Sequence, residues 1–401
     1  MAQTQLKRTL SLPLITFYGL GTVLGAGIYV LIGKVAGAAG VYAPYSFLMA
    51  ALIAIFTAFS YAELTSRYPK SAGEAVYVEE AFQLKWLSAL VGWMVVLTGM
   101  VSSAVMATGF VGYLQLFIAI PEGLAIFLLM LGLCLLAVWG IKQSALAITL
   151  ITLVEIGGLM MVLIIAGPGL SVTAFQDQSL IPPKDSGIWT GIILGGFLAF
   201  YAFVGFEDMV NVAEEVKKPR RNLPIAILLA ISIATFMYIL VALVAVMALP
   251  IEELANSKAP LAAIIESKGY SPILIGLISL FSVINGALVQ VIMASRVIYG
   301  MGKLGGAPKV LAKVHPNLQT PVQATVCVSL IILLLALLFP LVTLAKMTSF
   351  IILSVFALVN LSLLRVKRTR PLVEGAVSYP IIIPVIGFLL CSGILLFEAV
   401  N

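Results

Sequence analysis

The first long apolar run of the sequence contains the stretch Tyr18-Gly-Leu-Gly-Thr-Val-Leu-Gly-Ala-Gly-Ile-Tyr29. A later run contains Gly195-Gly-Phe-Leu-Ala-Phe-Tyr-Ala-Phe-Val-Gly-Phe-Glu-Asp208, in which an interior glycine precedes two acids. Glycines let membrane helices pack closely, and this remains an alternative for the first stretch. The recurrence of the pattern favours a helix that is interrupted near mid-membrane in both runs, because paired interruptions of this kind are typical of transporters.

The composition indicates an all-α integral membrane protein. Of the 401 residues, 62% are hydrophobic and only 10% are charged, whereas soluble domains average about 45–50% apolar and about 25% charged residues. A membrane-spanning helix needs about 20 mainly apolar residues, and eleven runs qualify. The runs are 12–35, 43–65, 86–116, 123–139, 144–166, 187–212, 223–249, 271–300, 322–339, 342–364 and 381–397.

The basic residues predict the orientation. Most of the 23 lysines and arginines lie in connections on one side of the predicted membrane, which places the N-terminus in the cytoplasm and the protein in the cytoplasmic membrane. The net charge of +6 could suggest nucleic acid, but these charges lie in short connections and are better explained as topology anchors. The connections are too short for a second domain, so residues 1–401 are expected to form one membrane domain.

Several classes of function are disfavoured by what the sequence lacks. The three cysteines and His315 are not clustered, which argues against a metal site or a disulfide framework. No cofactor is expected. No catalytic cluster such as HExxH or a Ser/His pair is present, so the protein is not expected to be an enzyme. Rings of charge and repeated carbonyl filters are also absent, which disfavours a passive channel.

The positions of the two interruptions predict an inverted repeat. The first and sixth runs are separated by an odd number of crossings and therefore run in opposite directions, as in transporters with two inverted halves. We expect five helices in each half, with the repeats at about 12–166 and 187–364 and an extra helix at about 381–397. Freed N–H groups at such breaks favour an anion and freed carbonyls favour a cation, so the site suits a zwitterion.

Four stretches resemble the amino acid-polyamine-organocation (APC) superfamily, and within it the prokaryotic amino acid permeases. They are Gly25-Ala-Gly-Ile-Tyr29, Glu63-Leu-Thr-Ser-Arg-Tyr-Pro-Lys-Ser-Ala-Gly-Glu74, Phe200-Tyr-Ala-Phe-Val-Gly-Phe-Glu207 leading into Ala213-Glu-Glu-Val-Lys-Lys-Pro219, and Ser295-Arg-Val-Ile-Tyr299 leading into His315-Pro316. The resemblance implies a LeuT-type inverted-repeat fold with unwound helices 1 and 6. It also implies transport of amino acids or related amines by alternating access.

The resemblance assigns roles to residues at both breaks. The N–H groups of Gly25, Ala26 and Gly27 would bind a substrate carboxylate. The substrate amine would meet the main-chain carbonyls of Val23, Tyr201, Ala202 and Val204. The side chains of Phe203 and Phe206, and also of Tyr201, would form the wall and gate of the site, with ordinary helix packing as the alternative.

The sequence departs from the family in two ways. Family members typically have twelve spans, whereas eleven are counted here. Several proton-coupled relatives carry a lysine in a Thr-x-x-Lys pattern in helix 5, where this chain has Thr152-Leu-Val-Glu155.

Glu155 lies at the centre of its run, where translocon scales put the cost of an ionisable residue at about 2.5–3.5 kcal/mol. It could hold a proton and release it when the site opens to water, which would couple a proton gradient to transport. It could instead bind a cation, such as Na⁺ or a cationic substrate, or play a structural role. For a cation, Ser279, Ser282 and Asn285 could supply further oxygens, although such residues also bond neighbouring helices.

Four charged residues are candidates for a cytoplasmic gate. Glu207 and Asp208 follow the second break, and Glu63 and Arg67 end the second run. We expect them to be the ends of charge networks that hold the inward gate closed, rather than substrate ligands, through exposed ion pairs that are weak enough to open in each cycle.

The sequence therefore predicts an amino acid transporter, with proton-coupled uptake as the primary hypothesis. An amino acid/polyamine exchanger and an organic-cation or sodium-coupled carrier are the alternatives. The identity of the amino acid and the oligomeric state are left open.

Overall fold

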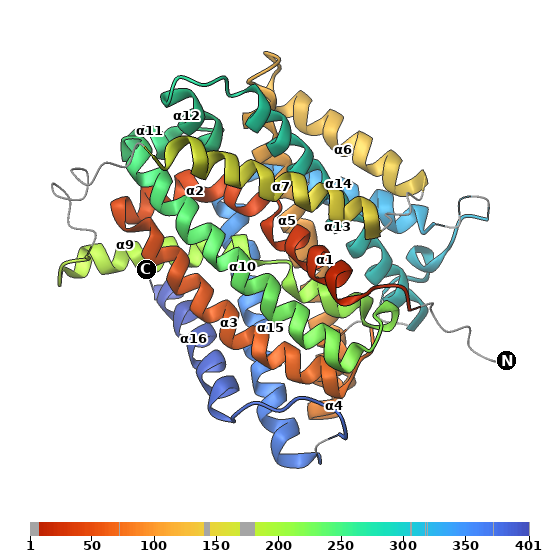
Figure 1. Ribbon diagram of the computed structural model, residues 1–401. Coiled ribbons are helices and arrows are strands. Elements are labelled where there is room, and N and C mark those ends of the chain that lie inside the picture. Colours follow the sequence, from red (N-terminus) through yellow and green to blue (C-terminus); the bar gives the residue numbers. More distant parts are fainter. Residues whose placement is uncertain are drawn as a thin grey trace.

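The computed structural model describes residues 8–71, 73–139, 145–168, 181–304, 307–316, 318, 320–371 and 373–400. These residues form a bundle of helices (Figure 1), and their β structure is limited to one isolated bridge between Leu10 and Val216. The predicted all-α class is therefore confirmed. The first residue of the run predicted at 144–166 lies outside the described residues.

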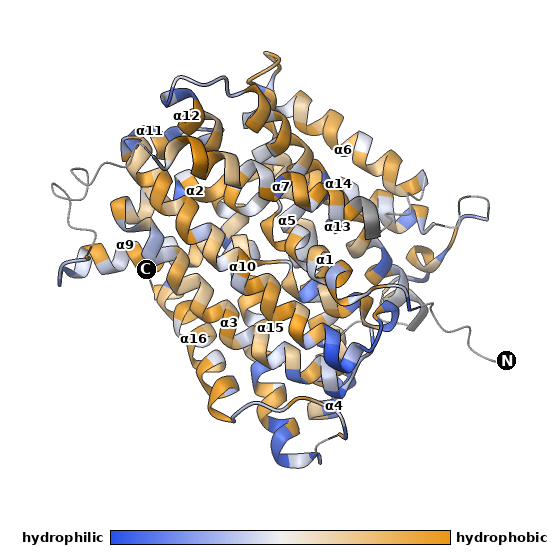
Figure 2. Ribbon diagram, viewed as in Figure 1, coloured by the Kyte–Doolittle hydropathy of each residue, from blue (hydrophilic) through white to orange (hydrophobic). Residues whose placement is uncertain are grey.

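Nine helical stretches of the described residues are long and apolar enough to cross a membrane. Hydrophobic residues cover most of the length of these helices, and hydrophilic residues gather mainly near their ends (Figure 2). The first half of the chain contributes α1 (Leu12–Leu24), α2 (Ala26–Ala39), η1 (Gly40–Tyr42), α3 (Ala43–Arg67), α4 (Gly73–Phe82), α5 (Lys85–Leu114), α6 (Glu122–Trp139) and α7 (Ala145–Ala166). The second half contributes α9 (Ser186–Ala199), η2 (Phe200–Phe203), η3 (Phe206–Glu215), α10 (Pro219–Ala248), α11 (Ile251–Asn256), α12 (Pro260–Ser267), α13 (Ile273–Leu304), η4 (Lys309–Ala312), α14 (Val322–Leu338), α15 (Leu341–Thr369) and α16 (Ile382–Val400).

All eleven predicted apolar runs fall on these helices. The first two runs share one helical stretch, Leu12–Arg67, because the connection between them is the short helix η1. The run at 322–339 corresponds to α14, which is a shorter apolar helix of 17 residues. The protein is a multi-pass membrane protein; the number of crossings stays a prediction.

Small side chains bring helices from the two halves of the chain together. The helix α3 packs along α10, α5 packs along α13, and α6 packs along α14. The α3–α10 pair buries alanines at every fourth position of each helix, so the two backbones can approach closely. These alanines are Ala50, Ala54, Ala58, Ala226, Ala230 and Ala234. Large apolar side chains such as Leu128 and Leu131 of α6 are exposed, as expected of a surface that faces lipid.

Candidate functional site

The first predicted interruption lies at Gly25, between α1 and α2. Its φ of −40° and ψ of −129° are not helical, and no side chain caps the new N-terminus of α2. Ala26 and Gly27 begin α2, so their N–H groups have no partner within that helix. Gly27 packs directly on the second interruption, since a Cβ at Gly27 would lie 2.5 Å from the Cα of Ala202.

The second predicted interruption lies at Val204 and Gly205, between η2 and η3. Val204 is extended, and Gly205 has a φ of +126°, a conformation that favours glycine. A Cβ at Gly205 would lie 2.5 Å from the carbonyl oxygen of Thr22 in α1. Each break therefore contacts the other span through a glycine, and the two interruptions lie against each other.

Tyr238 of α10 joins the two breaks, and sequence analysis did not identify it. Its hydroxyl lies 2.5 Å from the carbonyl oxygen of Val23 and 2.9 Å from that of Ala202. The hydroxyl has one hydrogen and donates to one of these oxygens at a time. The signal in the sequence was slight: one tyrosine hydroxyl in an apolar run that needs a buried partner.

The other predicted binding residues are packed around this junction. The carbonyl oxygen of Tyr201 accepts from the N–H of Val204 (3.1 Å), and the hydroxyl of Tyr201 contacts Ser102 of α5. The ring of Phe203 packs edge-on against Tyr238, with centroids 5.1 Å apart. Phe206 packs edge-on against the ring of Tyr61 in α3. These aromatic side chains are buried beside the breaks, and their role as wall or gate stays a prediction.

A small cavity lies beside α1, on the N-terminal side of its break. It is lined by residues of α1, α5, α7 and α13, namely Tyr18, Gly21, Thr22, Met106, Ile148, Asn285, Gly286, Val289 and Gln290. Its volume of about 20 Å³ holds about one water molecule. A molecule as large as an amino acid can therefore enter this side only after helices or side chains move.

Glu155 lies against the first break and has no polar partner for its carboxyl group. It is 1% exposed, and neither carboxyl oxygen accepts a hydrogen bond from any described residue. The neighbouring Ser282 of α13 likewise has no hydrogen-bond partner within the described part of the chain. Ser279, by contrast, donates to the carbonyl of Ile275 in its own helix.

Hydrogen bonds hold the helix of Glu155 to both sides of the broken span. The hydroxyl of Thr152 lies 3.1 Å from the carbonyl oxygen of Phe17 in α1. The hydroxyl of Tyr29 in α2 donates to the main-chain carbonyl of Glu155 at 2.7 Å, and Tyr113 donates to the carbonyl of Tyr29 at 2.6 Å. The carboxyl group of Glu155 therefore lies where α1 and α2 separate.

The two acids after the second break bind backbone and amide groups. A carboxylate oxygen of Glu207 accepts from the N–H of Gly205 at 2.8 Å. A carboxylate oxygen of Asp208 accepts from the side-chain amide of Gln290 in α13 at 3.2 Å. Both acids are buried, and neither belongs to an ion pair within the described residues. The ion pairs predicted for them are therefore not part of this conformation.

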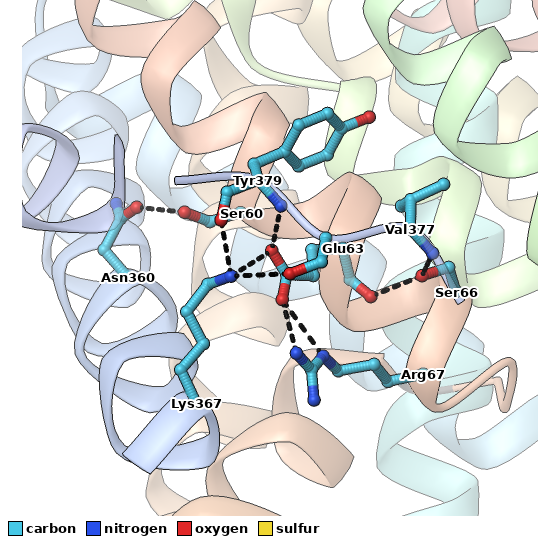
Figure 3. A network of polar contacts seen from close by, with 9 residues as sticks. Ser60, Glu63, Ser66, Arg67, Asn360, Lys367, Val377 and Tyr379 are labelled. Carbon is cyan, nitrogen blue, oxygen red and sulfur yellow. Dashed lines mark hydrogen bonds and ion pairs between the residues drawn. The ribbon is translucent and has the colours of Figure 1, made fainter. Parts of the chain in front are cut away.

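Glu63 is the centre of a buried charge network (Figure 3). Arg67 of α3 and Lys367 of α15 each approach a different oxygen of its carboxylate to 2.6 Å, and the N–H of Tyr379 donates to it at 2.9 Å. The side chains of Glu63, Arg67 and Lys367 are 0%, 4% and 9% exposed. The prediction of an exposed pair is wrong, because the segment around Val377 and Tyr379 covers it. Lys367 was missed.

Comparisons with known proteins agree with this architecture. The sequence matches the family described as amino acid permease over residues 10–400. The branched-chain amino acid permease BcaP of Bacillus subtilis (strain 168) is 29% identical, over 98% of this chain and 89% of that protein. The methylthioribose transporter of the same organism is also 29% identical, over 96% of this chain and 87% of its own length.

A eukaryotic relative covers most of this chain as well. The vacuolar cationic amino acid transporter 2 of Arabidopsis thaliana is 30% identical over 92% of this chain and 61% of its own length. The family and these relatives make the protein a transporter rather than an enzyme. The chain belongs to the amino acid permease family, within the APC superfamily.

Proposed function

We propose that this protein takes up amino acids across the cytoplasmic membrane, by alternating access and with a proton as the coupling ion. The observation that carries the proposal is the junction of the two broken spans at Gly27–Ala202 and Thr22–Gly205. The carboxyl group of Glu155, which has no hydrogen-bond partner among the described residues, lies beside it. Non-helical backbone at this depth is tolerated only where it is buried in protein or lines a cavity. In a transport site the non-helical backbone is buried in protein in one state and lines a cavity in the other.

The junction offers complementary groups to an amino acid. In the proposal, the N–H groups of Gly25, Ala26 and Gly27 bind the substrate carboxylate, helped by the positive end of the α2 dipole. The carbonyls of Val23, Tyr201, Ala202 and Val204 receive the ammonium group. The hydroxyl of Tyr238 donates to this carbonyl set, and it turns aside when the ammonium group arrives.

The helix pairs support an inverted repeat. The pairs α3–α10, α5–α13 and α6–α14 join helices at corresponding positions of the two predicted halves. Helices related by a twofold axis pack on one another when they lie next to that axis, so this pairing is the one that inverted halves produce.

With the N-terminus in the cytoplasm, as the basic residues predict, α1 lies on the cytoplasmic side of the first break.

Glu155 supplies the coupling in this proposal. An unpaired carboxylate is costly in a membrane interior, so the carboxyl group holds a proton while it is buried. Opening of the broken spans to water lets the proton leave. The binding of substrate at the adjacent junction and the loss of the proton are thereby linked to the same movement.

The test is uptake into liposomes that contain the purified protein, with and without an inward proton gradient. The substrates are branched-chain and cationic amino acids and methylthioribose. For Glu155→Gln we expect loss of gradient-driven uptake with exchange of internal for external substrate retained. Glu252→Gln, at an exposed position of α11, is the matched control. Unchanged gradient-driven uptake by Glu155→Gln would make Glu155 structural.

A second candidate is a sodium-coupled or organic-cation carrier of the same fold, or an exchanger of amino acids and polyamines. The oxygens of Glu155 and Ser282 favour it, because both lack partners among the described residues and oxygens of this kind bind cations. Uptake that follows a sodium gradient and ignores a proton gradient, or competition by polyamines, would select this alternative.

A further inference from the structure

Within the part of the chain that the structure describes, four buried carboxyl groups have no cationic partner. Glu74 of α4, Glu155 of α7, and Glu207 and Asp208 of η3 are each at most 3% exposed. The five ion pairs within the described ranges include none of them. Buried charge without a partner is costly, so these groups must take up protons or share them. Glu155 lies at the break of α1, whereas the other three lie toward the end of the bundle where α1 begins.

A polar face of α13 connects these two places. Ser282 adjoins Glu155, Asn285 and Gln290 line the cavity beside α1, and Gln290 binds Asp208. In a helix these three positions lie on one side, and Ser282 and Gln290 are separated by about 12 Å along the axis. The cavity between them has room for about one water molecule.

Gln290 is positioned to serve a bound water. It is 6% exposed and donates from its amide nitrogen to Asp208 at 3.2 Å. Its amide oxygen, although buried, has no hydrogen-bond partner in the described part of the chain. A Cβ at Gly99 of α5 would lie 2.8 Å from that oxygen, so the amide is held between α5 and Asp208. An unpaired buried acceptor at the wall of a cavity marks a place for a hydrogen-bond donor.

Asp208 has mainly acidic surroundings. Glu207 and Glu215 lie on its own element, and Glu74 faces it from α4. Tyr18 of α1 faces Asp208. The positive charge of Arg296 in α13 also acts on Tyr18. Burial, together with the nearby charge of Asp208, raises the pKa of Glu74 to about 7. Ionisation of one of these groups therefore disfavours ionisation of the next.

We infer that Asp208 is the proton acceptor on the cytoplasmic side, with Gln290 as its positioning residue. Glu155 and Asp208 do not line this cavity, so the transfer takes place when the broken spans open to water. The O–H bond of the Glu155 carboxyl then breaks, and its proton passes along hydrogen-bonded waters on the polar face of α13. The last of these waters gives one of its protons to the carboxylate of Asp208. One proton thus moves from Glu155 to Asp208 and no other reactant is consumed. This inference rests on the proposed proton coupling and names the route by which the proton leaves.

The experiment uses the full-length protein in liposomes that contain a pH-sensitive dye. Substrate-dependent proton entry and exchange of internal for external substrate are measured in the same preparation. For Asp208→Asn we expect proton entry to fall at least about tenfold while exchange persists. Asp208→Glu should restore part of the proton entry. Gln290→Leu should shift the pH profile of uptake, because Asp208 loses its amide donor, and Gln290→Glu should shift it differently.

The outcomes separate this inference from the proposed function. If the wild-type protein shows no substrate-dependent proton entry, or Glu155→Gln retains it, the proposed coupling itself fails. If Glu155→Gln loses proton entry and Asp208→Asn retains it, only the role of Asp208 is overturned. If Asp208→Asn also loses exchange, Gln290→Leu decides: an unchanged pH profile of uptake overturns the inference, and a shifted profile supports it.

Discussion

Glu63 and Glu155 are both glutamates of long apolar helices, and both are almost completely buried, but their surroundings are opposite. Glu63 is bound by two cations and a backbone N–H group. Glu155 has no hydrogen bond to its carboxyl group within the described residues. The charge of Glu63 is compensated, and its ion pair with Lys367 links α3 to α15. Burial of a carboxyl group without a partner is costly. The contrast indicates that burial alone does not distinguish a compensated carboxyl group from an uncompensated one.

The largest expected effect is on stability at the satisfied site. Glu63→Gln leaves Arg67 and Lys367 buried without a carboxylate, and we expect a loss of about 3–5 kcal/mol in the free energy of unfolding. Thermal unfolding in detergent measures it. Glu122→Gln, which breaks the exposed pair with Lys258, is the matched control and should cost less than about 1 kcal/mol. Equal effects of the two variants would contradict the contrast.

A second substitution should recover part of that loss. In the Glu63→Gln background, Lys367→Met removes one of the two uncompensated cations and keeps a side chain of similar length. We expect it to restore about 1–3 kcal/mol, although Lys367→Met alone is destabilising. A double-mutant cycle from the same unfolding curves measures the coupling. Simple additivity of the two losses would mean that Lys367 is stabilised elsewhere.

Glu74 allows the contrast to be examined by pH. Burial raises its pKa from 4.5 to about 7, so between these values the folded protein retains a proton that the unfolded chain loses. Stability contributed by this group is present below pH 4.5, falls as the pH rises toward 7, and is constant above that, for a total of about 3 kcal/mol. Glu74→Gln should flatten this part of the unfolding profile. An unaltered profile would show that another group titrates there.

The smallest expected effect on stability belongs to Glu155. Because its carboxyl group has no partner among the described residues, Glu155→Gln should change the free energy of unfolding by less than about 1 kcal/mol. The same variant should lose gradient-driven uptake. Unfolding curves and uptake measured on one preparation test both statements, and a large loss of stability would place Glu155 in the same class as Glu63.

Much of the fold could be predicted from local sequence. The apolar runs predicted the helices, because only backbone that is hydrogen-bonded within its own segment is stable in lipid. The interruptions at Gly25 and Gly205 were also predicted, since glycine at corresponding positions of two runs is a local signal. Glu155 was singled out by its position at the centre of an apolar run. Its use in transport remains a prediction.

The sequence by itself determined the membrane class, the helices, both breaks and the intramembrane carboxyl group, because each depends on residues close together in the chain. Only the tertiary structure decided the partners: the hydroxyl of Tyr238 at the carbonyls of Val23 and Ala202, and Lys367 at Glu63. These partners are separated by many residues in the chain. Whether a charge is buried and compensated depends on side chains that packing brings from distant helices, and no local pattern specifies them.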